Sequence, residues 1–87
     1  MLSAPPPPYP EFLKQAGTQG RVLIQAVIDT SGRAEPNSVR ILQSPNSAFD
    51  PGSRNWILHA LFRPARVHGR AVRVLIQVPL DYRITGR

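Results

Sequence analysis

Apolar and polar residues alternate over Ala71 to Ile84, and this alternation is the feature that most constrains the fold of the chain. Successive side chains of a β-strand point to opposite faces of a sheet, so the pattern predicts a long strand with one buried and one wet side. The chain must therefore build a sheet around this strand. The predicted inward side chains are Val72, Val74, Ile76, Val78, Leu80, Tyr82 and Ile84, and the outward ones are Arg73, Leu75, Gln77, Pro79, Asp81 and Arg83.

A second alternating stretch, Arg21 to Asp29, predicts another strand. The residues from Asp29 to Gly32 are typical of a tight turn, in which Gly32 is free to adopt positive φ. The next strand should start after Pro36, because a proline inside a paired strand removes a ladder donor. The inward side chains of these two strands are predicted to be Val22, Ile24, Ala26, Ile28, Val39 and Ile41.

Two short helices are expected around these strands. Pro10 to Ala16 should form the first, with Gly17 closing it and with Phe12, Leu13 and Ala16 docked on the core, because so short a helix does not persist alone. Asp50 is predicted to cap the second, which ends before a loop from Pro64 to Gly69. Its apolar stripe is predicted to be Trp56, Ile57, Ala60 and Leu61.

These elements predict an α+β fold of order α-β-β-α-β, with two helices packed on one face of a three-stranded antiparallel sheet. Pro79 favours an edge position for the last strand, which leaves the first strand in the centre. A chain of 87 residues forms one domain. With no cysteine and no cluster of metal ligands, helix-on-sheet packing must hold it together.

The run Pro5 to Pro8 has no hydrogen-bond donors and is expected to be an extended polyproline II segment. We therefore expect residues 1–8 to be the end of a proline-rich linker and residues 9–87 to be the folded domain. No apolar run approaches the roughly 20 residues that a membrane span needs. A membrane anchor, if the function needs one, is expected to lie outside this sequence.

The net charge of +6 comes from ten arginines and one lysine against five acids. The arginines are scattered, and only Arg63 to Arg73 forms a local cluster, so a nucleic-acid module is the least favoured reading. Catalysis has no support, because His59, His68 and the few acids supply no nucleophile, base and orienting group. The chain contains neither metal-ligand spacing nor a glycine-rich phosphate loop. We therefore expect no catalytic residue, no metal and no cofactor.

Short motifs along nearly the whole chain, from Pro7 to Ile84, resemble a known family in their order and spacing. They are Tyr9-Pro10, Gly20-Arg21-Val22, Ile28-Asp29 with Gly32, Val39 to Ser44, Phe49-Asp50, Phe62-Arg63-Pro64-Ala65 and Gly69-Arg70-Ala71-Val72. The family is the C-terminal domain of TonB-type energy transducers of Gram-negative bacteria.

Two departures from the family pattern stand out. Family members often have a tryptophan where this chain has Ala60, and Trp56 lies one turn earlier. Some members have glutamines before Tyr9, where this chain has prolines.

The resemblance implies a periplasmic domain, normally tethered to the inner membrane, that docks to outer-membrane TonB-dependent transporters. It implies that the last strand pairs with the transporter's TonB box peptide, while an N-terminal anchor couples to an inner-membrane motor. The expected partner-binding residues are Arg73, Val74, Leu75, Ile76, Gln77 and Val78, with Pro8 and Tyr9 beside the linker.

Two alternatives use the same strand in other ways. The chain could be an envelope adaptor of TolA type, or a stand-alone homodimer in which the last strands of two copies pair. The edge could also have no ligand, because Arg73, Pro79 and Arg83 are the charges and proline that keep sheet edges from aggregating.

Overall fold

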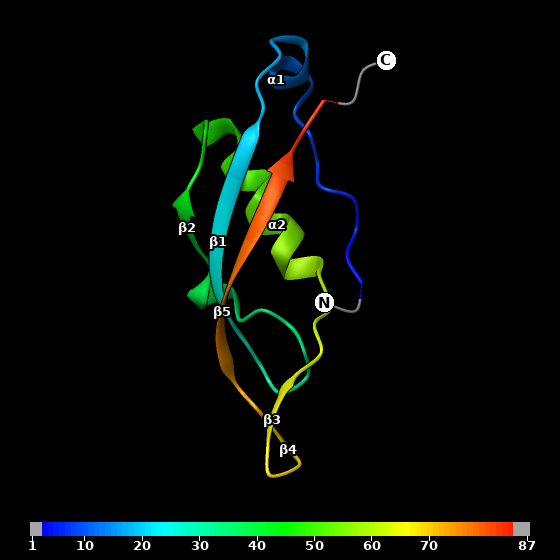
Figure 1. The fold of residues 1–87 in the computed structure, drawn as a ribbon, viewed down its shortest axis with the longest axis vertical. Helices are drawn as coiled ribbons and strands as arrows, with labels where there is room; N and C mark the ends of the chain where they lie inside the picture. The colour runs from blue at the N-terminus through cyan, green and yellow to red at the C-terminus, as the bar shows by residue number, and fades with distance from the viewer. Residues whose placement is uncertain (1–2, 85–87) are drawn as a thin grey trace.

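The computed structural model describes residues 3–84 and has the predicted α+β fold (Figure 1). The central sheet is antiparallel with strand order β2-β1-β5, so the first strand is in the middle and β5 lies at an edge, as Pro79 indicated. The helices are α1 (Glu11–Gln15) and α2 (Asp50–His59), with two 3-10 turns at Pro36–Ser38 and Ser47–Phe49. The strands are β1 (Gly20–Ile28), β2 (Arg40–Gln43), β3 (Ala65–Val67), β4 (Arg70–Val72) and β5 (Val74–Tyr82).

The core lies between the sheet and α2, which crosses one face of it (Figure 1). The inward side chains of β1 are all buried, as the alternation predicted, and the α2 stripe Trp56, Ile57 and Ala60 packs on them. Within residues 3–84, no helix covers the other face of the sheet. The buried apolar residues are Leu13, Val22, Ile24, Ala26, Ile28, Ala34, Val39, Phe49, Trp56, Ile57, Ala60, Phe62, Leu80 and Tyr82.

The helix ends differ in detail from the prediction. Gly17 closes α1 with φ of 74°, as expected, but of the three residues predicted to dock only Leu13 is buried, and Phe12 is 64% exposed. Asp50 does not cap α2. The 3-10 turn before α2 runs directly into it, so the cap moves back to Asn46, whose Oδ1 accepts the Ala48 N–H at 2.9 Å. No helix within residues 3–84 is both long and apolar enough to cross a membrane.

The long C-terminal strand was predicted as one element, and this is wrong. It breaks at Arg73, and its first part, β4, pairs with β3 in a separate hairpin where a loop was expected. His68 and Gly69 form the two-residue turn with φ of 51° and 78°. Positive φ at both positions is the geometry of a type I′ turn, which suits the twist of a tight hairpin. Figure 1 shows this hairpin projecting from one end of the long axis.

The N-terminal segment from Ser3 to Pro8, here called the strap, lies along α2 (Figure 1). Its four prolines are exposed, as in an extended run, but its main chain is bonded to the domain. Ser3 and Leu61 exchange two backbone hydrogen bonds of 3.2 and 2.8 Å, and the Trp56 indole N–H donates to the Pro5 carbonyl at 2.8 Å. The strap is thus held at two points on α2 and the residues after it.

Candidate docking edge

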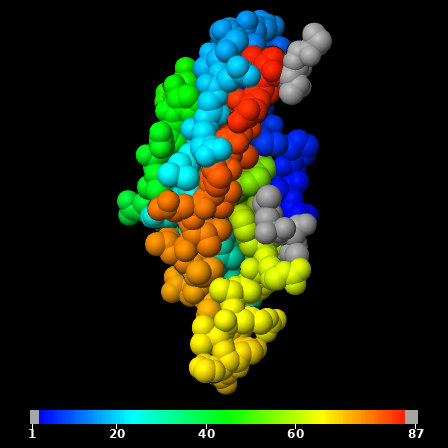
Figure 2. Space-filling model, in the orientation of Figure 1, coloured from blue at the N-terminus to red at the C-terminus, as the bar shows by residue number. Residues whose placement is uncertain are grey.

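The outer side of β5 is an open sheet edge within residues 3–84. On its inner side β5 pairs with β1 along its whole length, from Val74 opposite Ile28 to Tyr82 opposite Gly20. No described strand pairs with the other side. Figure 2 shows the strand at the surface over most of its length. An open edge offers unpaired N–H and C=O groups to another extended chain.

Hydrogen bonds at Val27 show which β5 residues direct their main chain to the open edge. The Val27 N–H donates to Ser38 Oγ at 2.9 Å, and its carbonyl accepts the Glu35 N–H at 2.9 Å, so both groups point away from β5. Val27 faces Leu75 across the antiparallel pair. In such a pair both residues turn their main-chain groups away from each other, so the N–H and C=O of Leu75 face the open edge.

The same geometry repeats at every second residue of β5. Gln77 therefore presents an N–H and a C=O to the open edge, and Pro79 presents a C=O only. This also explains how the sheet tolerates Pro79, since its missing N–H is not needed by β1. The part of the edge that offers both N–H and C=O groups is centred on Leu75 and Gln77, which lie within the predicted range Arg73 to Val78.

An apolar hollow of about 320 Å³, here called the edge groove, lies beneath this part of β5. On the β5 side it is lined by three inward side chains that are only half-buried, Val74, Ile76 and Val78. The remaining lining residues are Ile28, Phe62 and Arg63. Side chains of an added strand that point inward would enter this groove.

An ion pair lies just before β5, at the start of the open edge. Arg73 donates from Nε and Nη2 to the two carboxylate oxygens of Glu35 at 2.6 and 2.8 Å. The Arg73 guanidinium lowers the pKa of Glu35. Arg73 is thereby tied to the loop before β2, and Leu75, which is 59% exposed, is the first outward side chain of β5 beyond it. Two other predicted site residues also have side-chain partners: Gln77 Nε2 donates to Gln25 Oε1 at 3.4 Å, and the Tyr9 hydroxyl donates to the Thr18 carbonyl.

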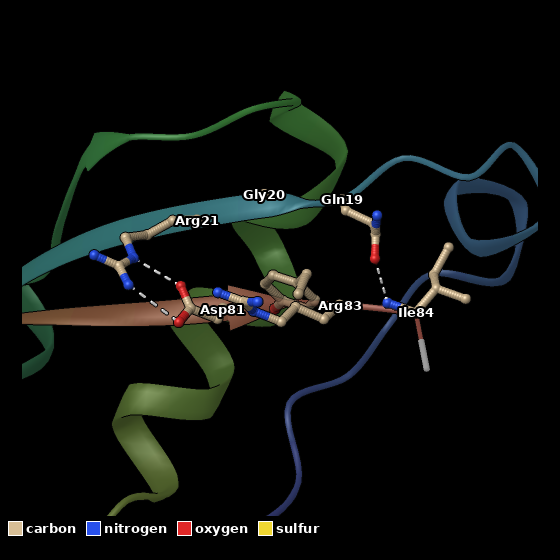
Figure 3. A pocket seen from close by; sticks show the side chains of 7 residues that line it. Gln19, Gly20, Arg21, Asp81, Arg83 and Ile84 are labelled. Atoms are coloured by element: carbon tan, nitrogen blue, oxygen red, sulfur yellow. Dashed lines mark hydrogen bonds and ion pairs between the residues drawn. The ribbon is translucent and has the colours of Figure 1, made fainter. Parts of the chain in front are cut away.

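A second hollow of about 570 Å³ lies at the far ends of β1 and β5 (Figure 3). Arg21 and Asp81 span its outer side through hydrogen bonds of 2.7 and 3.2 Å, and Arg21 lowers the pKa of the Asp81 carboxyl. Gln19 Oε1 accepts the Ile84 N–H at 2.6 Å. Arg21 and Asp81 bind each other, which makes this hollow a weaker candidate than the edge groove.

Pro8 and Tyr9, also predicted as contacts, lie away from the other predicted residues. The Tyr9 ring packs edge-on against Phe49 and Tyr82, with ring centroids 5.7 and 5.4 Å apart, and its hydroxyl donates to the Thr18 carbonyl. Tyr82 ends β5, about 26 Å from Val74 at roughly 3.3 Å per residue. The structure therefore does not bring Pro8 and Tyr9 together with Leu75 and Gln77.

Three residues of the edge groove were not predicted from sequence as site residues, namely Ile28, Phe62 and Arg63. Each belonged to a motif of the family resemblance, but nothing local indicated that the segment after α2 would return beside β5. Within residues 3–84 no group of acids and histidines is arranged to hold a metal ion.

Comparisons with known proteins agree with this architecture. The family model described as the Gram-negative bacterial TonB protein C-terminal matches residues 5–84. The solution NMR structure of the Pseudomonas aeruginosa TonB C-terminal domain superposes with a TM-score of 0.80 at 28% identity, covering 99% of this chain and 86% of that one. Comparison with curated protein sequences gave no match. The chain therefore belongs to the TonB C-terminal domain family.

Proposed function

We propose that this domain docks to outer-membrane TonB-dependent transporters by adding their TonB box peptide as a strand to the open edge of β5. The observation that carries the proposal is the outward main chain of Leu75 and Gln77 directly above the edge groove. Family membership supports the choice of partner. The domain acts as a binding module rather than an enzyme.

Main-chain pairing supplies the attraction in this mode. Leu75 and Gln77 offer two N–H and two C=O groups, and the peptide residues between those bonds point their side chains into the edge groove. Because main-chain groups are common to all residues, many peptide sequences fit. The groove restricts the inward positions to apolar side chains.

The expected affinity is low. Four hydrogen bonds at about 0.5–1.5 kcal/mol each contribute about 2–6 kcal/mol, while association costs about 4–15 kcal/mol. Burial in the edge groove must supply the remainder. We expect calorimetric titration to give micromolar or weaker binding of an isolated box peptide, and nanomolar binding would contradict this mechanism.

The proposal is tested by a matched pair of substitutions at one position. Gln77→Pro removes the outward N–H but no bond to β1, whereas Gln77→Ala keeps the N–H and removes only the side chain. We expect Gln77→Pro to weaken peptide binding by roughly 2- to 13-fold, corresponding to one lost bond of about 0.5–1.5 kcal/mol, while Gln77→Ala binds as the parent does.

Amide chemical shifts of the labelled domain locate the contact in the same titration. Signals of Arg73 to Val78 should move when the box peptide is added. Equal affinity of the two Gln77 variants, or shifts confined to Tyr9 and its surroundings, would refute docking at this edge.

The cellular setting follows from family membership as part of the proposal. The domain would act in the periplasm, tethered to the inner membrane through its proline-rich linker and an anchor, and would pass energy from an inner-membrane motor to the transporter. The placement of the linker in residues 1–8 also remains a prediction.

The same open edge supports a second candidate, a homodimer joined by its β5 strands. Its signature is a mass in sedimentation equilibrium that rises with concentration and falls again in Gln77→Pro. A monomer that ignores box peptides would instead favour an envelope adaptor of TolA type with another partner.

A further inference from the structure

The β3–β4 hairpin is exposed and basic. It projects from one end of a molecule whose extents are 48 × 25 × 15 Å (Figures 1 and 2). All five residues from Arg66 to Arg70 are exposed, and Val67 is 53% exposed. No acid occurs between Arg63 and Arg73. No residue of the hairpin belongs to the buried core, and the proposed strand pairing does not use the hairpin tip.

The register of the hairpin sends its two arginines in opposite directions. Arg66 pairs with Ala71 and Arg70 with Val67. Adjacent pairs of an antiparallel ladder project to opposite faces, so Arg66 and Arg70 lie on different faces of the ribbon. The His68-Gly69 turn is tight, and Arg66 Nη1 donates to the Gly69 carbonyl at 3.0 Å, so the tip is held in shape.

We propose that the tip of this hairpin contacts the anionic headgroup surface of a phospholipid bilayer. A flat acidic patch on a protein would meet only one face of the ribbon and leave the other arginine unused. A headgroup layer entered tip-first surrounds both faces, so both arginines meet phosphates while Val67 reaches the apolar boundary.

This inference rests on the periplasmic setting of the proposed function, where phospholipid rather than nucleic acid is the abundant polyanion. Contact through the tip would also orient the domain. β5 begins directly after the hairpin, so its Val74 end would lie nearest the bilayer.

The test is co-sedimentation of the domain with vesicles of phosphatidylcholine alone or with equal parts of phosphatidylglycerol. Binding should require phosphatidylglycerol and weaken with added salt. Each arginine near an anionic surface is worth roughly a fivefold change in partition, so Arg66→Gln with Arg70→Gln should reduce binding about 25-fold.

The matched control is Arg40→Gln with Arg83→Gln, which removes the same charge from exposed positions away from the hairpin. It should change vesicle binding by less than about threefold, since screened charges remote from the surface contribute little. Both double variants should bind the box peptide as the parent does. A failure of peptide binding alone therefore bears on the strand-pairing proposal and not on this one.

Three outcomes would overturn the inference. They are equal losses in the two double variants, equal binding to both kinds of vesicle, and equally tight binding of duplex DNA with the same sensitivity to Arg66 and Arg70. The last result would make the hairpin a nucleic-acid site.

Discussion

At the scale of single residues, the buried polar pair Ser53 and Tyr82 joins α2 to the end of β5. Ser53 Oγ donates to the Phe49 carbonyl at 2.7 Å and lies 3.0 Å from the Tyr82 hydroxyl, which therefore donates to it. Burial raises the pKa of Tyr82. The Tyr82 ring also stacks on Phe49 with centroids 4.3 Å apart. Each polar atom of the pair thus has a partner.

This arrangement predicts unequal costs for the two conservative deletions. Ser53→Ala leaves the buried Tyr82 O–H without an acceptor and should lower the free energy of unfolding by about 1–3 kcal/mol. Tyr82→Phe leaves Ser53 bonded to Phe49 and should cost only about 0.5–1.5 kcal/mol. Urea unfolding of both variants and of the double variant measures this. A larger cost for Tyr82→Phe, or strictly additive costs, would show that the two hydroxyls do not form a pair.

At the scale of elements, the strap, which contains the run Pro5 to Pro8, is held against the folded domain. Pro8 packs so closely on α2 that a Cβ on Gly52 would lie 2.8 Å from its ring. With the Trp56 and Leu61 bonds, these contacts hold the strap against α2 and the residues after it rather than against the sheet. A force applied to the strap would therefore act on α2 before it acts on β1.

Trp56→Phe is predicted to loosen the strap without unfolding the domain. The phenyl ring keeps most of the packing but loses the N–H bond to Pro5, a change of about 0.5–1.5 kcal/mol. Hydrogen exchange of the Leu61 amide should accelerate, because that amide bonds to the Ser3 carbonyl. The neighbouring Phe62 amide, which bonds to Gly32 at 2.8 Å, serves as control. Equal acceleration of both amides would mean global destabilisation, and no acceleration would mean that Trp56 does not hold the strap.

At the scale of the whole molecule, a basic chain uses three of its five acids to hold its surface together. The pKa of Asp29 is lowered mainly by the Ser31 hydroxyl, that of Glu35 by Arg73, and that of Asp81 by Arg21. Two of these bonds connect segments far apart in sequence. The Arg21–Asp81 pair links β1 to the end of β5. The Arg73–Glu35 pair links the residue just before β5 to the loop before β2.

These shifts set the pH dependence of stability. A lowered pKa in the folded state means that the unfolded state binds more protons as the pH falls. The ion pair of Glu35 therefore stabilises the fold fully above the ordinary glutamate pKa of 4.5. This stabilisation is lost as the pH falls through the lowered pKa of the folded state. Glu35→Gln should therefore unfold at a lower temperature than the parent at neutral pH, with a gap that narrows as pH falls below 4.5. Thermal melts across this range test it, with the exposed Glu11→Gln as control. A gap of constant size would show that the Glu35 charge is not responsible.

Strand parity, the central position of β1, the edge position of β5 and the turn at Gly32 were all predictable from sequence. Each depends on a local rule: side-chain alternation, the missing donor of Pro79, or the conformational freedom of glycine. The edge that carries the proposed site was therefore visible in the sequence of β5 itself.

Only the tertiary structure decided which groups that edge presents and what lies beneath it. The outward direction of Leu75 and Gln77 follows from bonds that Val27 makes with Glu35 and Ser38, and the edge groove exists because Phe62 and Arg63 return beside β5. The β3–β4 hairpin likewise replaced a predicted loop because its pairing partner lay in what looked like the start of one long strand. Contacts between segments distant in sequence have no local period, so a pattern within one segment cannot reveal them.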